Sequence, residues 1–221
     1  IRSFKKIDLK ISPINEIELN ILFKYSKSFE KLFNKRCQLI KKMNLNLKSL
    51  NENDFKKFIS QYPGAHVVTY INCSAEIKGL STIVCTSSNA KRVIESIPEG
   101  KTIIFAPDKN LGHYLIKETG RNMILWEGSC IVHEAFSFER IVNLSKTYPK
   151  AKFIAHPESE SQILEIADYI GSTSGLLKFV EENSATEFIV ATEAGILYEM
   201  EKRCPNKIFI PAPVEDETCA C

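Results

Sequence analysis

The region from Tyr62 to Pro213 carries one pattern of short apolar runs twice over. When Tyr62 is placed on Tyr148, a shift of 86 residues, about 65 positions align without a gap. Few residues are identical, so the evidence is that the apolar positions stay in phase, as they do in internal repeats. We therefore expect two similar units. The runs are 66–71, 81–86, 102–107 and 122–126, and then 152–156, 168–171, 187–192 and 207–212.

Helical patterns between the apolar runs indicate the fold class. Strands that alternate with helices are typical of parallel α/β sheets. We expect two tandem three-layer αβα units, each with a short parallel four-stranded sheet, joined by a longer helix over 133–147. The other helices are predicted near 74–80, 88–97 and 109–119. The predicted domains are a divergent, mostly helical N-terminal segment (1–50), a first α/β unit (51–128), a second α/β unit (129–213) and a cysteine-containing tail (214–221).

The same alignment places polar residues of the two units on one another at the strand ends. Tyr70 and Asn72 fall on His156 and Glu158, and the turn 85–88 falls on the turn 171–174. In parallel α/β sheets, ligands gather at the carboxyl ends of the strands. The helices that follow present free N–H groups, which favour anions. We therefore expect two polar edges that face one cleft.

Each of these residues also has a plain structural interpretation. The hydroxyl-rich turns 87–89 and 172–175 could be helix N-caps, although their matched positions favour binding of phosphate or carboxylate. His156 could be a satisfied core residue. Because side chains two apart on a strand share a side, His156 and Glu158 could instead form a pair that moves protons. Tyr70 could be an edge residue with a satisfied hydroxyl.

Cys130 lies three residues before His133, near the junction of the two units. A buried structural cysteine is the ordinary interpretation, but a thiolate at a helix start would be stabilised and would suit a metal. Cys219 and Cys221 are a weaker indication of a metal site. The turn Thr192–Gly195 is expected to be a helix cap.

Composition excludes several classes of protein. The net charge of +2 gives no drive toward nucleic acid or membrane surfaces. No apolar run approaches the roughly 18 residues that would span a bilayer. Seven cysteines at irregular spacing favour free thiols or metal ligands over disulfides. We expect a cytoplasmic protein and, from the Ile at position 1 and the stop after Cys221, a fragment of a longer one.

Six segments between about residue 50 and residue 221 together resemble quinolinate synthase, the iron–sulfur enzyme family of NAD biosynthesis. That family is built from three similar α/β domains around a central cleft, and this chain resembles the second and third. The segments, in unbroken order, are YPGAHVVTYINCSAEIKGLSTIVCTSSNAKRVI, IIFAPDKNLGHYL, WEGSCIVHEAF, AHPESESQILEIADYIGSTSGLL, FIVATEAGILYEMEKRCP and FIPAPVEDETCAC.

The resemblance implies a reaction in which iminoaspartate condenses with dihydroxyacetone phosphate to give quinolinate, with loss of water and phosphate. It also implies a [4Fe–4S] cluster that acts as a Lewis acid. By position, Cys130 resembles a cluster ligand, with His133 packed nearby. The implied catalytic residues are His156, Glu158 and Tyr70, and the implied substrate contacts are Asn72, Ser87, Ser172 and Thr173.

The chain departs from the family pattern in its first 50 residues and at its cysteines. The first-domain His-x-Tyr and Gly-Asp-Ser motifs do not occur in residues 1–50. Asn44 stands where a second cluster cysteine is expected, and Cys37 is too far away to replace it without rearrangement. The third ligand is expected three residues beyond Cys221. Ser159 replaces a cysteine that is common in the family but does not bind the cluster.

Two hypotheses of different class follow. The chain is part of a quinolinate synthase whose first domain and remaining ligands come from a longer parent protein or a partner chain. Alternatively, it is a non-catalytic remnant that binds phosphate or a dicarboxylate without a cluster. A generic sugar-phosphate-binding α/β protein is a third hypothesis, which the ordered motifs make less favoured.

Overall fold

The structure is a computed structural model that describes residues 52–215. The predicted helical segment 1–50, with Cys37 and Asn44, lies outside the described residues, as do Cys219 and Cys221. Within residues 52–215, no helix has both the length and the apolar character that crossing a membrane requires.

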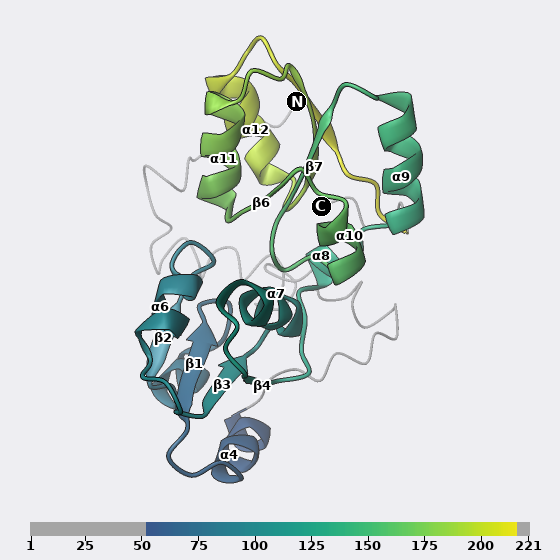
Figure 1. Cartoon of the computed structure of the whole chain (residues 1–221). Helices are drawn as coiled ribbons and strands as arrows, with labels where there is room; N and C mark the ends of the chain where they lie inside the picture. The colour runs from purple at the N-terminus through teal and green to yellow at the C-terminus, as the bar shows by residue number, and fades with distance from the viewer. Residues whose placement is uncertain (1–51, 216–221) are drawn as a thin grey trace, which may run out of the picture. The chain divides into compact units, whose positions relative to one another are not determined.

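Two parallel four-stranded sheets form the framework, which confirms the predicted fold class. Figure 1 shows each sheet with its own set of helices. The first sheet has the order β2-β1-β3-β4 and the second has the equivalent order β6-β5-β7-β8. The strands are β1 (His66–Tyr70), β2 (Ile83–Cys85), β3 (Ile103–Ala106), β4 (Ile124–Leu125), β5 (Lys152–Ala155), β6 (Tyr169–Ile170), β7 (Glu187–Ala191) and β8 (Ile208–Pro211).

Helices cover both faces of each sheet, so each unit has the three layers that were expected. In the first unit, α6 and α7 pack on one face and α4 and α5 on the other. In the second unit, α11 and α12 take one face and α9 and α10 the other. The helices are α4 (Glu52–Ser60), α5 (Ala75–Gly79), α6 (Ala90–Ser96), α7 (Lys109–Thr119), α8 (Ile131–Glu134), α9 (Phe138–Thr147), α10 (Ser161–Glu165), α11 (Thr173–Glu182) and α12 (Gly195–Arg203).

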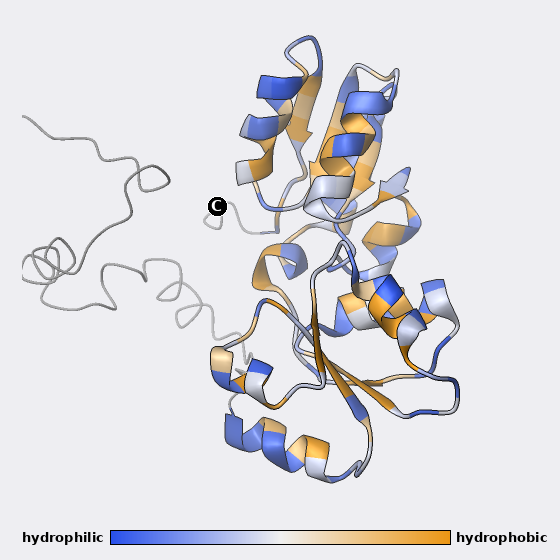
Figure 2. Ribbon diagram, turned by 90° about the vertical axis from the view of Figure 1, so that its left-hand side faces the viewer, coloured by the Kyte–Doolittle hydropathy of each residue, from blue (hydrophilic) through white to orange (hydrophobic). Residues whose placement is uncertain are grey.

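The central strands are apolar along their whole length because both of their faces are buried. All four residues of β3 are buried, and alternate residues enter different cores. Phe105 packs with α6 and α7, whereas Ile104 packs with α4 and α5. In Figure 2 the strands are mostly coloured as hydrophobic, whereas the helices carry both hydrophilic and hydrophobic segments.

The gap-free alignment of the two units is wrong by one residue in the third strand. In the first unit Val68 pairs with Phe105, but in the second Ile154 pairs with Val190 and not with Ala191. Strands β3 and β7 therefore correspond at a shift of 85 residues, as their shared core faces require. A one-residue slip would turn every side chain of the strand to the opposite face.

The single helix predicted over 133–147 is also wrong, because the chain forms two helices there. Helix α8 ends at Glu134, and Phe136 pairs with Val214 as an isolated antiparallel bridge. Ser137 then begins α9 as its N-cap, with its hydroxyl accepting the N–H of Arg140. A capping serine offers the backbone an alternative to continuing a helix. The predicted domain boundaries, at 50, 128 and 213, stay a prediction.

Candidate functional site

Glu158 of the second unit is the point at which the polar strand ends of the two units meet. Tyr70 is the last residue of β1, and Glu158 follows the end of β5 by three residues. The Tyr70 hydroxyl donates to the Glu158 Oε2 at 3.4 Å, and both side chains are buried. Burial, and then the neighbouring Glu158 carboxylate, raise the pKa of the Tyr70 hydroxyl. Tyr70 is therefore a neutral hydrogen-bond donor at pH 7.

His156 lies beside the same carboxylate. Its Nδ1 is 3.1 Å from the Glu158 Oε2 and 3.4 Å from the Glu158 backbone N. The Glu158 backbone N–H donates to this Nδ1, and the Glu158 carboxylate lies beside the same nitrogen. The side chains two residues apart thus share one side of the strand end, as the sequence pattern predicts.

His133, on the short helix α8, completes the polar group. Its ring stacks on the His156 ring, with centroids 4.7 Å apart. Its Nδ1 is 3.6 Å from the Glu158 Oε2, too far for a hydrogen bond, and is buried without a partner. Its Nε2 lies 3.4 Å from the Thr192 hydroxyl. Burial lowers the pKa of His133 to about 4, so the ring is neutral at pH 7.

Cys130 occupies the N-cap position of α8 beside these groups. Its sulfur, a His133 ring nitrogen and a Glu158 oxygen lie within 4.8 Å of one another, an arrangement that could hold a metal ion. The expected stabilisation of a thiolate is not found. Burial raises the pKa of the Cys130 thiol to about 11, and α8 has four residues. Without a cation the thiol stays protonated at pH 7, and metal binding would release its proton.

The described residues fit a four-iron cluster in part. Such clusters bind cysteine thiolates, and Cys130 is half-buried at the site with the unpartnered His133 Nδ1 beside it. The other described cysteines have different surroundings. Cys85 and Cys204 belong to the cores of the first and second unit, and the Cys73 thiol donates to the Tyr70 carbonyl. Further thiolates would have to come from outside residues 52–215.

Two hydroxyl-rich turns, one from each unit, line a single cavity of about 470 Å³. Ser87 follows β2, and Ser172 follows β6 and caps α11 by accepting the N–H of Gly175. The turns 87–89 and 192–195 contain the N-cap positions of α6 and α12, Asn89 and Ala194, but neither residue makes a side-chain cap bond. The lining residues are Ser87, Ser88, Lys91, Tyr114, Leu115, Pro157, Tyr169, Gly171, Ser172, Ser174, Gly175 and Lys178.

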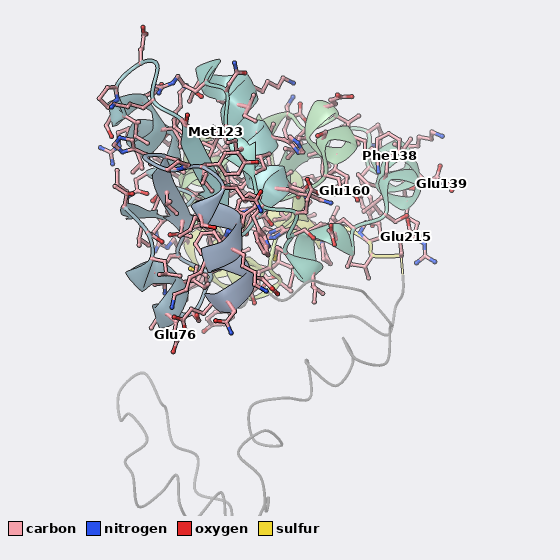
Figure 3. All side chains as sticks on the ribbon, turned by 90° about the horizontal axis from the view of Figure 1, so that it is seen from below. Glu76, Met123, Phe138, Glu139, Glu160 and Glu215 are labelled. Carbon is pink, nitrogen blue, oxygen red and sulfur yellow. The ribbon has the colours of Figure 1, made fainter. Side chains whose placement is uncertain are left out.

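Two predicted substrate contacts lie apart from these groups. Asn72 is exposed. It does not line this cavity, and it does not belong to the candidate metal-binding group of Cys130, His133 and Glu158. Thr173 is exposed at the first position of α11 and does not line the cavity either. Several carboxylates are exposed, whereas Glu158 is buried. In Figure 3, Glu76, Glu139 and Glu215 lie at the periphery of the molecule.

Three polar residues that the sequence reasoning did not select belong to the surroundings of the site. Asp108 and Asn110 stand at the start of α7, and Thr192 follows β7. All three are buried. Buried polar residues directly after apolar strands were a usable signal, since the segment APDKN has the same strand-end position as AHPES.

The fold places the chain in the class of parallel α/β proteins, in which small ligands bind at the carboxyl ends of the strands. Comparison with known families identifies the chain more closely. The model of the quinolinate synthetase A protein (NadA) family matches residues 36–221, and the chain belongs to this family.

Curated relatives agree with the family match. A quinolinate synthase of Chloroherpeton thalassium is 56% identical over 169 residues, which are 76% of this chain and 52% of the relative. A quinolinate synthase of Thermosynechococcus vestitus is 55% identical over 167 residues, again 76% and 52%. A quinolinate synthase of Microcystis aeruginosa is 54% identical over 173 residues, which are 78% of this chain and 54% of the relative. The chain therefore spans about half the length of these relatives.

Proposed function

We propose that this chain forms the second and third domains of a quinolinate synthase, which condenses iminoaspartate with dihydroxyacetone phosphate to give quinolinate. The contact between Tyr70 of the first unit and Glu158 of the second carries the proposal, because it joins the two polar strand ends into one site. The relatives are about twice as long as the matched region. We therefore propose that a first domain completes the cleft.

The proposed roles follow from the surroundings of each group. The Glu158 carboxylate accepts a hydrogen bond from Tyr70 and lies 3.1 Å from the His156 Nδ1, so His156 and Glu158 together can take a proton from substrate and return it. Tyr70, which keeps its proton, can orient a substrate carbonyl or carboxylate oxygen. Neutral His133 leaves its Nδ1 available beside the carboxylate.

Cys130 is the proposed ligand of a [4Fe–4S] cluster in this part of the protein. When bound, such a cluster supplies a Lewis acid for substrate carboxylate and hydroxyl groups. Ser87 and Ser172 are proposed to bind the phosphate or carboxylate of the substrates, because both line the cavity between the units. Asn72 and Thr173 stay predicted contacts that the described geometry does not bring to the site.

A second candidate function is binding of phosphate or a dicarboxylate without a cluster. It is favoured by one observation: among the described residues the site holds a single thiol, while the hydroxyl-lined cavity contains Lys91 and Lys178. Lys91 also pairs with Glu118 at 3.4 Å and Lys178 with Glu182 at 3.7 Å. Both ammonium groups are largely exposed, so each contributes modestly to anion binding.

Anaerobic reconstitution separates the two functions. The 221-residue chain would be treated with iron and sulfide, alone and together with the part of the Chloroherpeton thalassium relative that it does not match. Cluster formation is followed by visible absorbance, and quinolinate formation by chromatography. The proposed enzyme requires that the complemented chain acquires a cluster and makes quinolinate. Phosphate binding with neither a cluster nor a product favours the second function.

Cysteine variants assign the ligand within this experiment. Cys130→Ala should abolish stable cluster absorbance in the complemented protein. Cys204→Ala removes a thiol buried in the core of the second unit and should leave the absorbance unchanged. Equal cluster content in both variants would exclude Cys130 as a ligand.

A further inference from the structure

We propose that the turn Asp108–Asn110 at the start of α7 is a positioning device that fixes Cys130 and Glu158 relative to each other. Its three consecutive residues each bond to a segment that carries a proposed site residue. The roles of Cys130 and Glu158 rest on the proposed function, but the bonds of the turn do not.

Asp108 uses both of its carboxylate oxygens. Its Oδ1 accepts the N–H of Leu111 at 2.7 Å and so caps α7. Its Oδ2 accepts the N–H of Cys130 at 2.7 Å. A cap requires one acceptor, which serine or asparagine supplies equally well. Asp108 is 2% exposed, so its second oxygen is removed from water and needs a partner in the protein. The N–H of Cys130 is that partner. At 2.7 Å, this bond is at the short end of the range for N–H···O hydrogen bonds.

Backbone contacts hold the loop before Cys130 against the same turn. The N–H of Lys109 donates to the Gly128 carbonyl at 2.7 Å. A Cβ atom at Gly128 would lie 2.5 Å from the Pro107 carbonyl oxygen, closer than any side chain tolerates. The loop therefore approaches the turn at a distance that requires glycine. Together with the bond from Asp108, these contacts hold both ends of the segment from Gly128 to Cys130.

Asn110 extends the device to the second unit. Its side-chain Nδ2 donates to the Glu158 carbonyl at 3.2 Å, and Asn110 itself is 9% exposed. This bond acts on the backbone of Glu158, whereas Tyr70 and His156 act on its carboxylate. Cys130 and Glu158, which belong to two different segments, are thus both anchored to the start of α7. This anchoring keeps the separation of the thiol and the carboxylate constant.

Hydrogen–deuterium exchange of the 221-residue chain tests the proposal without any activity measurement. Asp108→Asn keeps one oxygen, which can cap α7, but replaces the second oxygen with an NH₂ group. That group cannot accept the N–H of Cys130. Asp108→Ser caps the helix and is too short to reach Cys130. Asn110→Ala removes the bond to Glu158. Ser74→Ala, which removes the cap of α5 in the same unit, is the matched control.

We expect each variant to act on its own segment. Asp108→Asn should speed exchange in the peptide 128–133 by roughly tenfold, because the buried hydrogen bond to the Cys130 N–H is lost. Asn110→Ala should speed exchange in the peptide 156–161 and leave 128–133 near its wild-type rate. Ser74→Ala should change neither peptide.

Three results would overturn the positioning role. They are unchanged exchange at 128–133 in Asp108→Asn, an increase spread over all peptides including α9 and α12, and the same response in Ser74→Ala. If Asp108→Asn does not fold, Asp108→Ser gives the same comparison. Failure of quinolinate formation in the complemented chain would leave these exchange rates unaffected, so the two proposals fail separately.

Discussion

At the scale of single residues, Glu158 is the central side chain of the proposed site, because it is buried and contacted from both units. Tyr70, His156 and His133 surround one of its oxygens within 3.1 to 3.6 Å. Sequence reasoning selected Tyr70, His156 and Glu158 from their positions at strand ends, and Cys130 from its spacing to His133 at the junction of the two units. It did not select Asp108, although the position of this residue after an apolar strand was a usable signal; the bond to Cys130, 22 positions away, cannot be seen in the sequence.

Glu158→Gln should remove turnover while it leaves the fold intact. Glutamine keeps the side-chain volume and one oxygen acceptor but cannot take up a proton. In the complemented protein we expect turnover to fall by roughly 100-fold to 10,000-fold, with a melting temperature within a few degrees of the wild type. His156→Ala should behave in the same way.

The control for these variants is Glu139→Gln, which changes an exposed carboxylate at the periphery. It should leave turnover and thermal stability unchanged. A large fall in melting temperature for Glu158→Gln, with turnover that follows the amount of folded protein, would assign Glu158 a purely structural role.

Cys85 makes stability depend on pH in the alkaline range. Burial, and then the neighbouring Cys73, raise the pKa of the Cys85 thiol from 9.0 to about 12. The unfolded chain loses this proton first. The contribution is therefore complete below about pH 9, and it falls as the pH rises toward 12. Between pH 8 and pH 10, urea unfolding should show about 1 kcal/mol more loss of stability in the wild type than in Cys85→Ala. Equal losses would contradict the raised pKa.

At the scale of helices and strands, the sequence predicts the elements well and their details less well. Every strand predicted from a β-branched run occurs, because central parallel strands are apolar along their length. The helix over 133–147 was predicted as continuous because its apolar spacing continues, but Phe136 pairs with Val214, a residue far away in the sequence. The predicted register of β7 was wrong for a related reason. A shift of the alignment by one residue leaves the run apolar and only exchanges the two faces of the strand.

Gly128→Ala should destabilise the loop that carries Cys130. Its Cβ would meet the Pro107 carbonyl oxygen, which belongs to the backbone and cannot rotate away. We expect a loss of about 1–3 kcal/mol in the free energy of unfolding. Gly79→Ala in α5 is the matched substitution, since nothing lies within 4 Å of its Cβ.

Gly79→Ala should be neutral or should stabilise the protein by up to about 1 kcal/mol, because alanine has the higher helix propensity. Chemical denaturation of the two variants measures the difference. Equal stability of Gly128→Ala and the wild type would show that the loop does not approach the turn as closely as described.

At the scale of the whole molecule, two units with equivalent strand orders supply different residues to the proposed site. The first unit would contribute Tyr70 and Ser87, and the second would contribute His156, Glu158 and Ser172. Sequence reasoning predicted this pairing because the repeat aligns the strand ends. The exposed positions of Asn72 and Thr173 could not be predicted from the repeat, since alignment gives a place on a strand end and no side-chain direction.

Calorimetric titration of the 221-residue chain with dihydroxyacetone phosphate tests the central claim, which is that both units bind one small anion. The account predicts one molecule bound per chain. Ser87→Ala in the first unit and Ser172→Gly in the second, where glycine retains most of the cap, should each weaken that binding by roughly tenfold, whereas Ser74→Ala should not. Two binding sites per chain, no binding, or sensitivity to a serine of one unit alone would contradict it.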